Sequence, residues 1–276
     1  MIVRQVSNGE VALVRQSDHA DLAAQFAAHF GNDQFAAVQP FESVVRATTY
    51  HDSHFLDVEA NLPIDVANGR PYGHRETPFS QDHLDALQGN VRWLLSRDPL
   101  AGLLVSMHHS GLPQNRYGLV NSWQTRGGAG AKSRTIRPEI AANIKTLETQ
   151  QAEVRTKLVA ERLATDNQID TNYRLLQFFD LLSLYLCNDG YQNGELRPTW
   201  IGPVPMHYKG RECPEIRVEP LPAMKFRLSP YPFSAPQLRV SVPVRFVRPL
   251  PGASAMVCRE AVMKASREYL SWVIVS

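Results

Sequence analysis

The sequence predicts a mainly α protein: a helical bundle flanked by an N-terminal β-hairpin and a proline-rich, antiparallel C-terminal β section, and therefore α+β overall. Segments before residue 195 have the start signals and apolar spacing of helices. The frequency of proline changes there, since seven of the nineteen prolines precede residue 195 and twelve follow it. We expect a hairpin over 1–15, a helical domain over 16–194 and a β-rich section over 195–276 packed on the bundle.

In the hairpin, Asn8-Gly9 is expected to close two apolar runs. Most of the helices that follow begin at a capping residue or a proline. They are expected from Ser17 or Asp18 to Gly31, from Pro40 through FESVVRATTYHD, from Ser80 through QDHLDALQGNVRWLL, from Asp98 and Pro99 through LAGLLVSMHHSGL, from about Glu139 to Ala164, and through NYRLLQFFDLLSLYLC. The last is apolar nearly all round and is expected to be central.

The C-terminal section consists of short alternating runs between prolines, EIRVEPL, MKFRLS and LRVSVPVRFV. Alternation with period two favours antiparallel strands, and the prolines favour strand edges and bulges. A last helix is expected near Ala255–Leu270, before a short strand WVIV. The section carries twelve basic and six acidic residues. Arginines that alternate along a strand are typical of a solvated face, so we expect no nucleic acid partner; a cap on the bundle or a homodimer interface is favoured.

Composition indicates an ordinary soluble protein of 276 residues, with 43% apolar and 20% charged side chains and a formal charge of +2. No apolar run approaches the ~18–20 residues of a membrane span, and the sequence does not open with a signal-peptide pattern. We therefore expect no membrane contact and a cytoplasmic location. Cys187, Cys213 and Cys258 lack the spacing of a metal knuckle or a disulfide framework and are expected to be reduced.

Residues 113–135 form a glycine-containing basic segment without any acidic residue. The stretch GGAGAKS does not have the spacing of a phosphate-binding loop, because Ala131 separates Gly130 from Lys132. Two interpretations stay open, a lid over an anionic substrate and a plain surface loop. In the first, the substrate-binding residues are Arg116, Arg126 and Lys132.

Histidines fall at the ends of the expected helices: His19, His51, His83 and the pair His108-His109, with Asp52 directly after His51. Imidazole and carboxylate suit Mn, Fe, Zn or Co, and packed helix ends can bring several ligands to one point. Asp180 lies inside an apolar helix, where an ionised carboxylate needs a partner. Plainer alternatives stay open: exposed first-turn histidines, satisfied core histidines, and an Asp180 bonded to Tyr173 or Arg174. His54 and His74 are expected at the surface, and the alternative is that they orient the ligand residues.

The ordered set His19, His51-Asp52, His83, His108 and Asp180 resembles the H…HD…H…H…D pattern of the HD-domain metalloenzyme superfamily. That superfamily is an all-helical bundle that binds one or two metal ions. The stretches QSDHADLA, LLVSMHHSGL and LQFFDLLSLYLC, together with the His51-Asp52 pair, also resemble a bacterial family known as domain of unknown function 3891. The resemblance to this second family implies no particular activity.

The first resemblance implies an HD-like bundle with one or two divalent ions, Fe or Mn favoured, and an Asp52 that bridges them. His19, His51 and Asp180 would hold one ion, and His83 with His108, or alternatively His109, the other. The function we expect is a metal-dependent hydrolase acting on a small phosphorylated, anionic compound, with Asp52 as a catalytic residue. Arg46, one turn before the His51-Asp52 pair, is the second expected catalytic residue, because it could meet the anionic substrate. A di-iron oxygenase acting on a small organic acid or phosphonate, and a non-catalytic binding protein, remain the alternatives.

Overall fold

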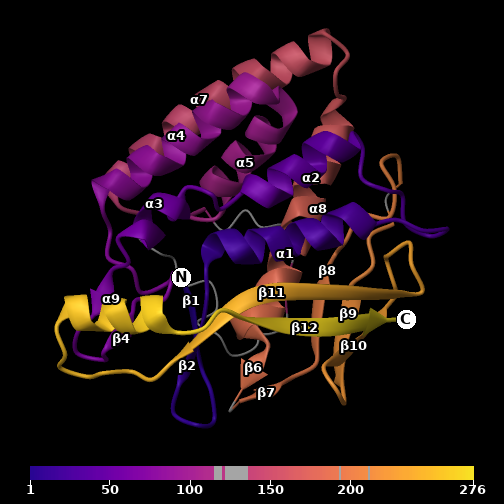
Figure 1. Ribbon diagram of the computed structural model, residues 1–276. Helices are drawn as coiled ribbons and strands as arrows, with labels where there is room; N and C mark the ends of the chain where they lie inside the picture. The colour runs from indigo at the N-terminus through magenta and orange to yellow at the C-terminus, as the bar shows by residue number, and fades with distance from the viewer. Residues whose placement is uncertain (115–119, 122–135, 193, 211) are drawn as a thin grey trace.

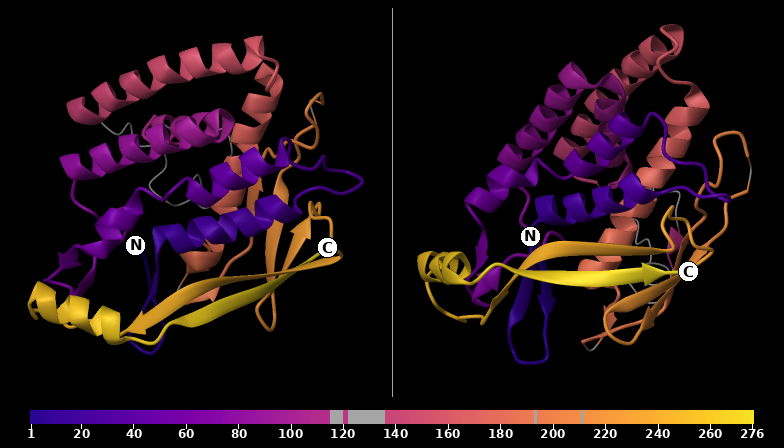
Figure 2. Two further views of the ribbon diagram at one scale, coloured as in Figure 1. Left: turned by 45° about the horizontal axis from the view of Figure 1, so that its top comes forward. Right: turned by 45° about the vertical axis from the view of Figure 1, so that its right-hand side comes forward.

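The computed structural model is an α+β protein in which helices pack on one side of a large curled sheet (Figure 1). The structure describes residues 1–276 except 115–119, 122–135, 193 and 211. Helices α4, α5 and α7 lie farthest from the sheet, and α1 and α2 lie between them and the long strands. Figure 2 shows α8 running from this helical layer into the curl of the sheet.

The helices follow one another through the first two thirds of the chain, and one more lies near the C-terminus. Their bounds are α1 Gln16–His29, α2 Phe41–Tyr50, α3 Phe55–Ala60, α4 Gln81–Arg97, α5 Pro99–Gly111, α7 Pro138–Ala160, α8 Asp166–Leu184 with the π-helical turn η1 Tyr185–Asp189, and α9 Ala255–Lys264.

Most of the strands come from the first fifteen residues and from the chain after residue 190. Their bounds are β1 Ile2–Gln5, β2 Val11–Val14, β3 Ile64–Asp65, β4 Arg70–Pro71, β5 Val120–Asn121, β6 Tyr191–Gln192, β7 Glu195–Leu196, β8 Thr199–Gly202, β9 Ile216–Leu221, β10 Lys225–Ser229, β11 Gln237–Val247 and β12 Glu268–Val275. The main sheet has the order β1-β2-β11-β12-β10-β9-β8-β5, and β10 pairs with β12 in parallel, so the sheet is mixed.

The prediction of a mainly α bundle with minor β additions is therefore wrong. The segments expected to form the N-terminal hairpin do pair as β1 and β2, but β2 also pairs with β11, which makes the hairpin one edge of the main sheet. The expected final helix ends at Lys264, and β12 occupies residues 268–275. Long-range pairing joins these strands into one sheet, and a local periodicity does not show such pairing.

One continuous apolar core joins the sheet to the helices. Strand β11 buries alternate side chains, among them Val240 and Val242, and the neighbouring β12 buries Trp272. On the helical side, Phe26 of α1 and Phe178 of α8 belong to the same core. As predicted, α8 is central, with most of its residues buried.

Two local features fix the residue at which helix α5 begins and how closely α5 packs on α4. Asp98 caps the helix, since its Oδ1 accepts a hydrogen bond of 3.0 Å from the backbone N–H of Ala101, and Pro99 occupies the first turn. Gly102 lets α5 approach α4 closely, because a Cβ there would lie 2.6 Å from the backbone nitrogen of Leu95.

Within the described residues, no helix combines the length and apolarity that crossing a bilayer requires.

We expect Leu104→Ala to lower the free energy of unfolding by about 2–5 kcal/mol, because Leu104 is fully buried in the core and the change leaves a cavity. Urea unfolding followed by circular dichroism measures the loss. Leu112→Ala is the matched control, since this leucine at the end of α5 is 46% exposed, and it should change the free energy by about 0.5 kcal/mol or less. Equal losses in both variants would contradict the central place of α5.

Candidate metal centre

Four helices bring five of the predicted ligand residues together, and we call this group the Asp52 cluster. His19 comes from the first turns of α1, His51 and Asp52 follow α2, His108 lies near the end of α5, and Asp180 lies within α8. All five are buried, with Asp52 the most exposed at 7%. Their convergence agrees with the expected meeting of helix ends.

The Asp52 carboxylate is the hub of the cluster. Its Oδ2 lies 3.0 Å from His19 Nε2 and accepts a hydrogen bond of 3.0 Å from Gln16 Nε2. Its Oδ1 lies 3.7 Å from His108 Nε2. Both oxygens thus face polar side chains from α1 or α5, so this buried acid has the partners that its charge requires.

Asp180 faces the same imidazoles from α8. Its Oδ1 lies 3.5 Å from His51 Nε2 and 3.8 Å from His19 Nε2. The alternative partner Arg174 is engaged elsewhere, because its guanidinium donates to the backbone oxygen of Pro203 at 3.0 Å. The buried acid of the apolar helix therefore has histidine partners.

Ligand atoms within 4.8 Å of one another form two groups that share His51. One group is His19, His51 and Asp180; the other is His51, Asp52 and His108. Each combines imidazole nitrogens with a carboxylate oxygen, a donor set that suits Fe, Mn, Zn or Co.

Hydrogen bonds on the far side of two rings fix which nitrogen faces the carboxylates. His51 Nδ1 lies 2.7 Å from the backbone oxygen of Thr48, which only accepts, so Nδ1 carries the hydrogen. The Ser183 hydroxyl donates to the backbone oxygen of Asp180, so His19 Nδ1, 2.8 Å from Ser183 Oγ, is the donor of that pair. Both Nε2 atoms therefore face the carboxylates, as metal-ligating histidines do when their other nitrogen is tied to the protein.

The charges in the cluster are strongly coupled. Burial lowers the pKa of His51, but the charges of Asp52 and Asp180 outweigh it and raise that pKa to about 9. Burial raises the pKa of Asp180, but hydrogen bonding and charge from His51 outweigh it and lower that pKa to about 2. The pKa of Asp52 lies well below its usual value for the same reason, with His51 the strongest favourable partner. The cluster therefore stabilises positive charge between two carboxylates, which is where a cation would bind.

The sixth predicted ligand, His83, lies in a different group. Its ring centroid is 4.9 Å from that of His54, and the His54 ring lies 4.6 Å from that of His109. We call His54, His83 and His109 the histidine trio. The expectation that His54 lies at the surface is wrong, since it is 6% exposed. One feature of the sequence indicated this burial: His54 follows His51 by three residues, which is about one helical turn.

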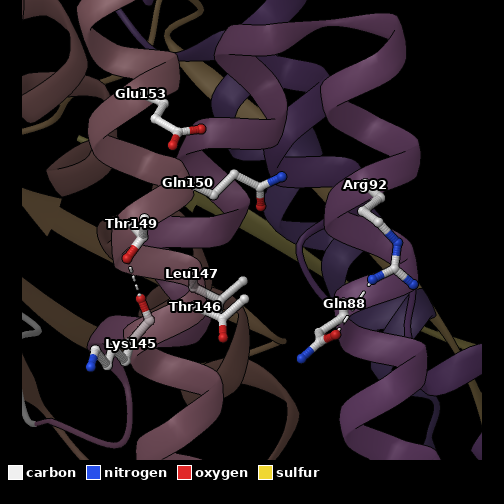
Figure 3. Close-up of a pocket in the computed structure, with 8 residues that line it drawn as sticks. All are labelled: Gln88, Arg92, Lys145, Thr146, Leu147, Thr149, Gln150 and Glu153. Carbon is white, nitrogen blue, oxygen red and sulfur yellow. Dashed lines mark hydrogen bonds between the residues drawn. The ribbon is translucent and has the colours of Figure 1, made fainter.

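Arg46, which was predicted to be catalytic, does not join the Asp52 cluster. Arg46 forms an ion pair with Asp98, the residue that caps α5. Arg116, Arg126 and Lys132 lie outside the described residues. A pocket between α4 and α7 is also separate from the cluster, because its lining includes Gln88 and Lys145 and contains no histidine (Figure 3).

Fold and site together define an α+β protein with a buried histidine–aspartate cluster that has the donor set of a metal site. The chain belongs to the family described as "Protein of unknown function (DUF3891)", whose match covers residues 1–249. No curated protein and no solved structure matches the chain.

His74, which lies outside both the Asp52 cluster and the histidine trio, should make the free energy of unfolding depend on pH. Burial, followed by the charges of Arg75 and the N-terminus, lowers the pKa of His74 from 6.5 to about 3. The unfolded chain therefore binds a proton below about pH 6.5 that the folded protein does not bind, so stability is present above this pH and falls as the pH drops toward 3. At about pH 5.5, protonation of His74 in the unfolded chain lowers the free energy of unfolding by about 1.4 kcal/mol.

We expect His74→Gln to lose less stability than wild type between about pH 7.5 and pH 5.5, by roughly that 1.4 kcal/mol. Urea unfolding at the two pH values measures the difference. His29→Gln, which removes an exposed imidazole at the end of α1, should behave as wild type. The same pH response in His74→Gln and wild type would show that His74 is protonated in the folded protein.

Proposed function

We propose that the protein is a metal-dependent hydrolase of the HD-like type that acts on a small phosphorylated compound, with the Asp52 cluster as its metal centre. The observation that carries the proposal is the pair of buried carboxylates facing three imidazoles, two of which hold their Nε2 toward the carboxylates. The order of these residues along the chain also resembles that of the HD superfamily, which supports the same chemistry.

The donor set fits a divalent ion that would be held by His19, His51 and Asp180, or by His51, Asp52 and His108. A bound metal of this kind supplies hydroxide at neutral pH and polarises a phosphoryl oxygen. Asp52, whose two oxygens face different imidazoles, would serve as a metal ligand. Ser183 is a positioning residue, because it accepts the hydrogen bond from His19 Nδ1 and so fixes the orientation of that ring.

Arg46 takes no direct part in catalysis, since its guanidinium pairs with Asp98. That pair connects α2 to the start of α5 and so helps to hold two elements of the cluster. Recognition of an anionic substrate by Arg116, Arg126 and Lys132 stays a prediction, because these residues lie outside the described ones.

We expect wild-type protein, purified without a chelator or a histidine tag, to contain Fe or Mn. Asp180→Asn and Asp52→Asn should each bind the metal at least about 100-fold more weakly, since each change removes a charged ligand. Plasma mass spectrometry and metal titration measure this. Asp33→Asn, at an exposed position, is the matched control. Metal content unaffected by both cluster variants would place the metal elsewhere and end the proposal.

We expect the metal-loaded protein to release phosphate from a panel of small phosphomonoesters, and Ser183→Ala to lower kcat about 10–100-fold while still binding metal, because the His19 ring loses its acceptor. A colorimetric phosphate assay measures the rate, with Asp33→Asn again as the control. Dioxygen uptake by the iron form with one of the small organic acids or phosphonates, without phosphate release, would instead identify an oxygenase.

A further inference from the structure

Gln16, the first residue of α1, contacts the Asp52 cluster although it is not one of the expected ligands. Its Nε2 donates a hydrogen bond of 3.0 Å to Asp52 Oδ2. Gln16 is 3% exposed, so this hydrogen bond is shielded from bulk water. Because hydrogen bonds to an ionised group are roughly twice as strong as those between neutral groups, the contact is a substantial constraint on the Asp52 carboxylate.

Gln16 is itself held in place by a residue of α3. Its backbone N–H is at the start of α1, where the N–H groups have no acceptor within the helix. Glu59 Oε1 accepts a hydrogen bond of 2.8 Å from this N–H, and the Glu59 side chain is buried. Arg15, at the N-cap position, makes no capping hydrogen bond with its side chain. Glu59 therefore supplies the missing acceptor and fixes the backbone of Gln16 beside Asp52.

The hydrogen bond from Gln16 determines which oxygen of Asp52 faces α5. Oδ2 lies 3.0 Å from Gln16 Nε2 and 3.0 Å from His19 Nε2, both on α1. The two oxygens of a carboxylate point in different directions, so with Oδ2 fixed on the α1 side, Oδ1 is directed to His108 Nε2, at 3.7 Å. The last torsion of an aspartate side chain is soft. Gln16 thus holds the carboxylate in the orientation in which each oxygen faces an imidazole.

The two glutamines of α1 differ in how their amides are satisfied. Gln25 uses both ends, since it donates to the backbone oxygen of Ser241 at 2.9 Å and accepts from its N–H at 3.1 Å. Gln16 Oε1 is buried and has no hydrogen-bond partner within the described part of the chain. A buried acceptor without a donor costs free energy that an apolar side chain would not. Gln25 therefore joins the helix to the sheet, whereas Gln16 serves Asp52 and leaves its own oxygen unpaired.

We propose that Gln16 is a positioning residue of the metal centre and acts on the ion through the orientation of Asp52. The inference rests on the proposed function, because it requires an ion at the Asp52 cluster. Residues that hydrogen-bond to a ligating side chain typically contribute about 10–100-fold to metal affinity. Ser183 of α8 has this part for His19, and Gln16 of α1 has it for Asp52.

Co²⁺ titration of the full-length, chelator-treated protein, followed by visible absorption, tests this assignment. We expect Gln16→Met, which keeps the length of the side chain but removes the donor, to weaken Co²⁺ binding about 10–100-fold. The d–d absorption spectrum of the loaded variant should also differ from that of wild type, because the carboxylate is no longer fixed. Gln16→Ala removes the same donor with a residue that favours helix, and should have the same effects.

Gln25→Met is the matched control on the same helix. It should lower the midpoint of urea unfolding, because the hydrogen bonds to Ser241 are lost. It should nevertheless keep the Co²⁺ affinity within about threefold of wild type, since the effects of changes at separate sites are independent, and it should leave the absorption spectrum unchanged.

Wild-type affinity and spectrum in both Gln16 variants, with the wild-type circular dichroism spectrum, would overturn the role of Gln16 and leave the metal centre in place. An equal loss of affinity in Gln25→Met would overturn it too, because a general loosening of α1 would then explain both results. A wild-type protein that binds no Co²⁺, or binds it as tightly as Asp52→Asn does, would instead remove the metal centre of the proposed function, and the inference with it.

Discussion

The buried Asp52 carboxylate is the constraint on which the arrangement of the helices depends. Its oxygens face His19 and Gln16 of α1 and His108 of α5, while Asp52 itself follows α2. An ionised carboxylate taken out of water costs several kcal/mol unless its partners are close and well oriented. The ends of these helices therefore have little freedom to shift relative to one another, and the polar cluster specifies their positions as well as offering ligands.

The sheet supports this cluster through helix α1. Gln25 of α1 donates a 2.9 Å hydrogen bond to the backbone oxygen of Ser241 on β11 and accepts one of 3.1 Å from its N–H. Phe26 of the same helix packs on Phe233, with ring centroids 5.9 Å apart. Helix α1 is thus fixed on its far side by residues more than 200 positions away, and His19 is held with it.

The features that could be predicted from the sequence are those marked by residues close together along the chain. Asp180 stands out as an acid in an apolar helix, and the His51-Asp52 pair ends a recognisable helix, so both could be found from the residues. The main sheet could not be found in this way, because residues 11–13 pair with residues 245–247, and no local pattern encodes that separation. The burial of His54 was missed for a related reason: it depends on the packing of α4 and α5 around a stretch without helical periodicity.

His51 and His54 show how the same side chain acquires opposite properties about one helical turn apart. Both are buried, and burial alone lowers the pKa of each. His51 faces two carboxylates and reaches a pKa of about 9. His54 is surrounded by other imidazoles and an aromatic ring, and its pKa falls to about 3. The two carboxylates that face His51 thus account for the opposite pKa shifts of these two buried rings.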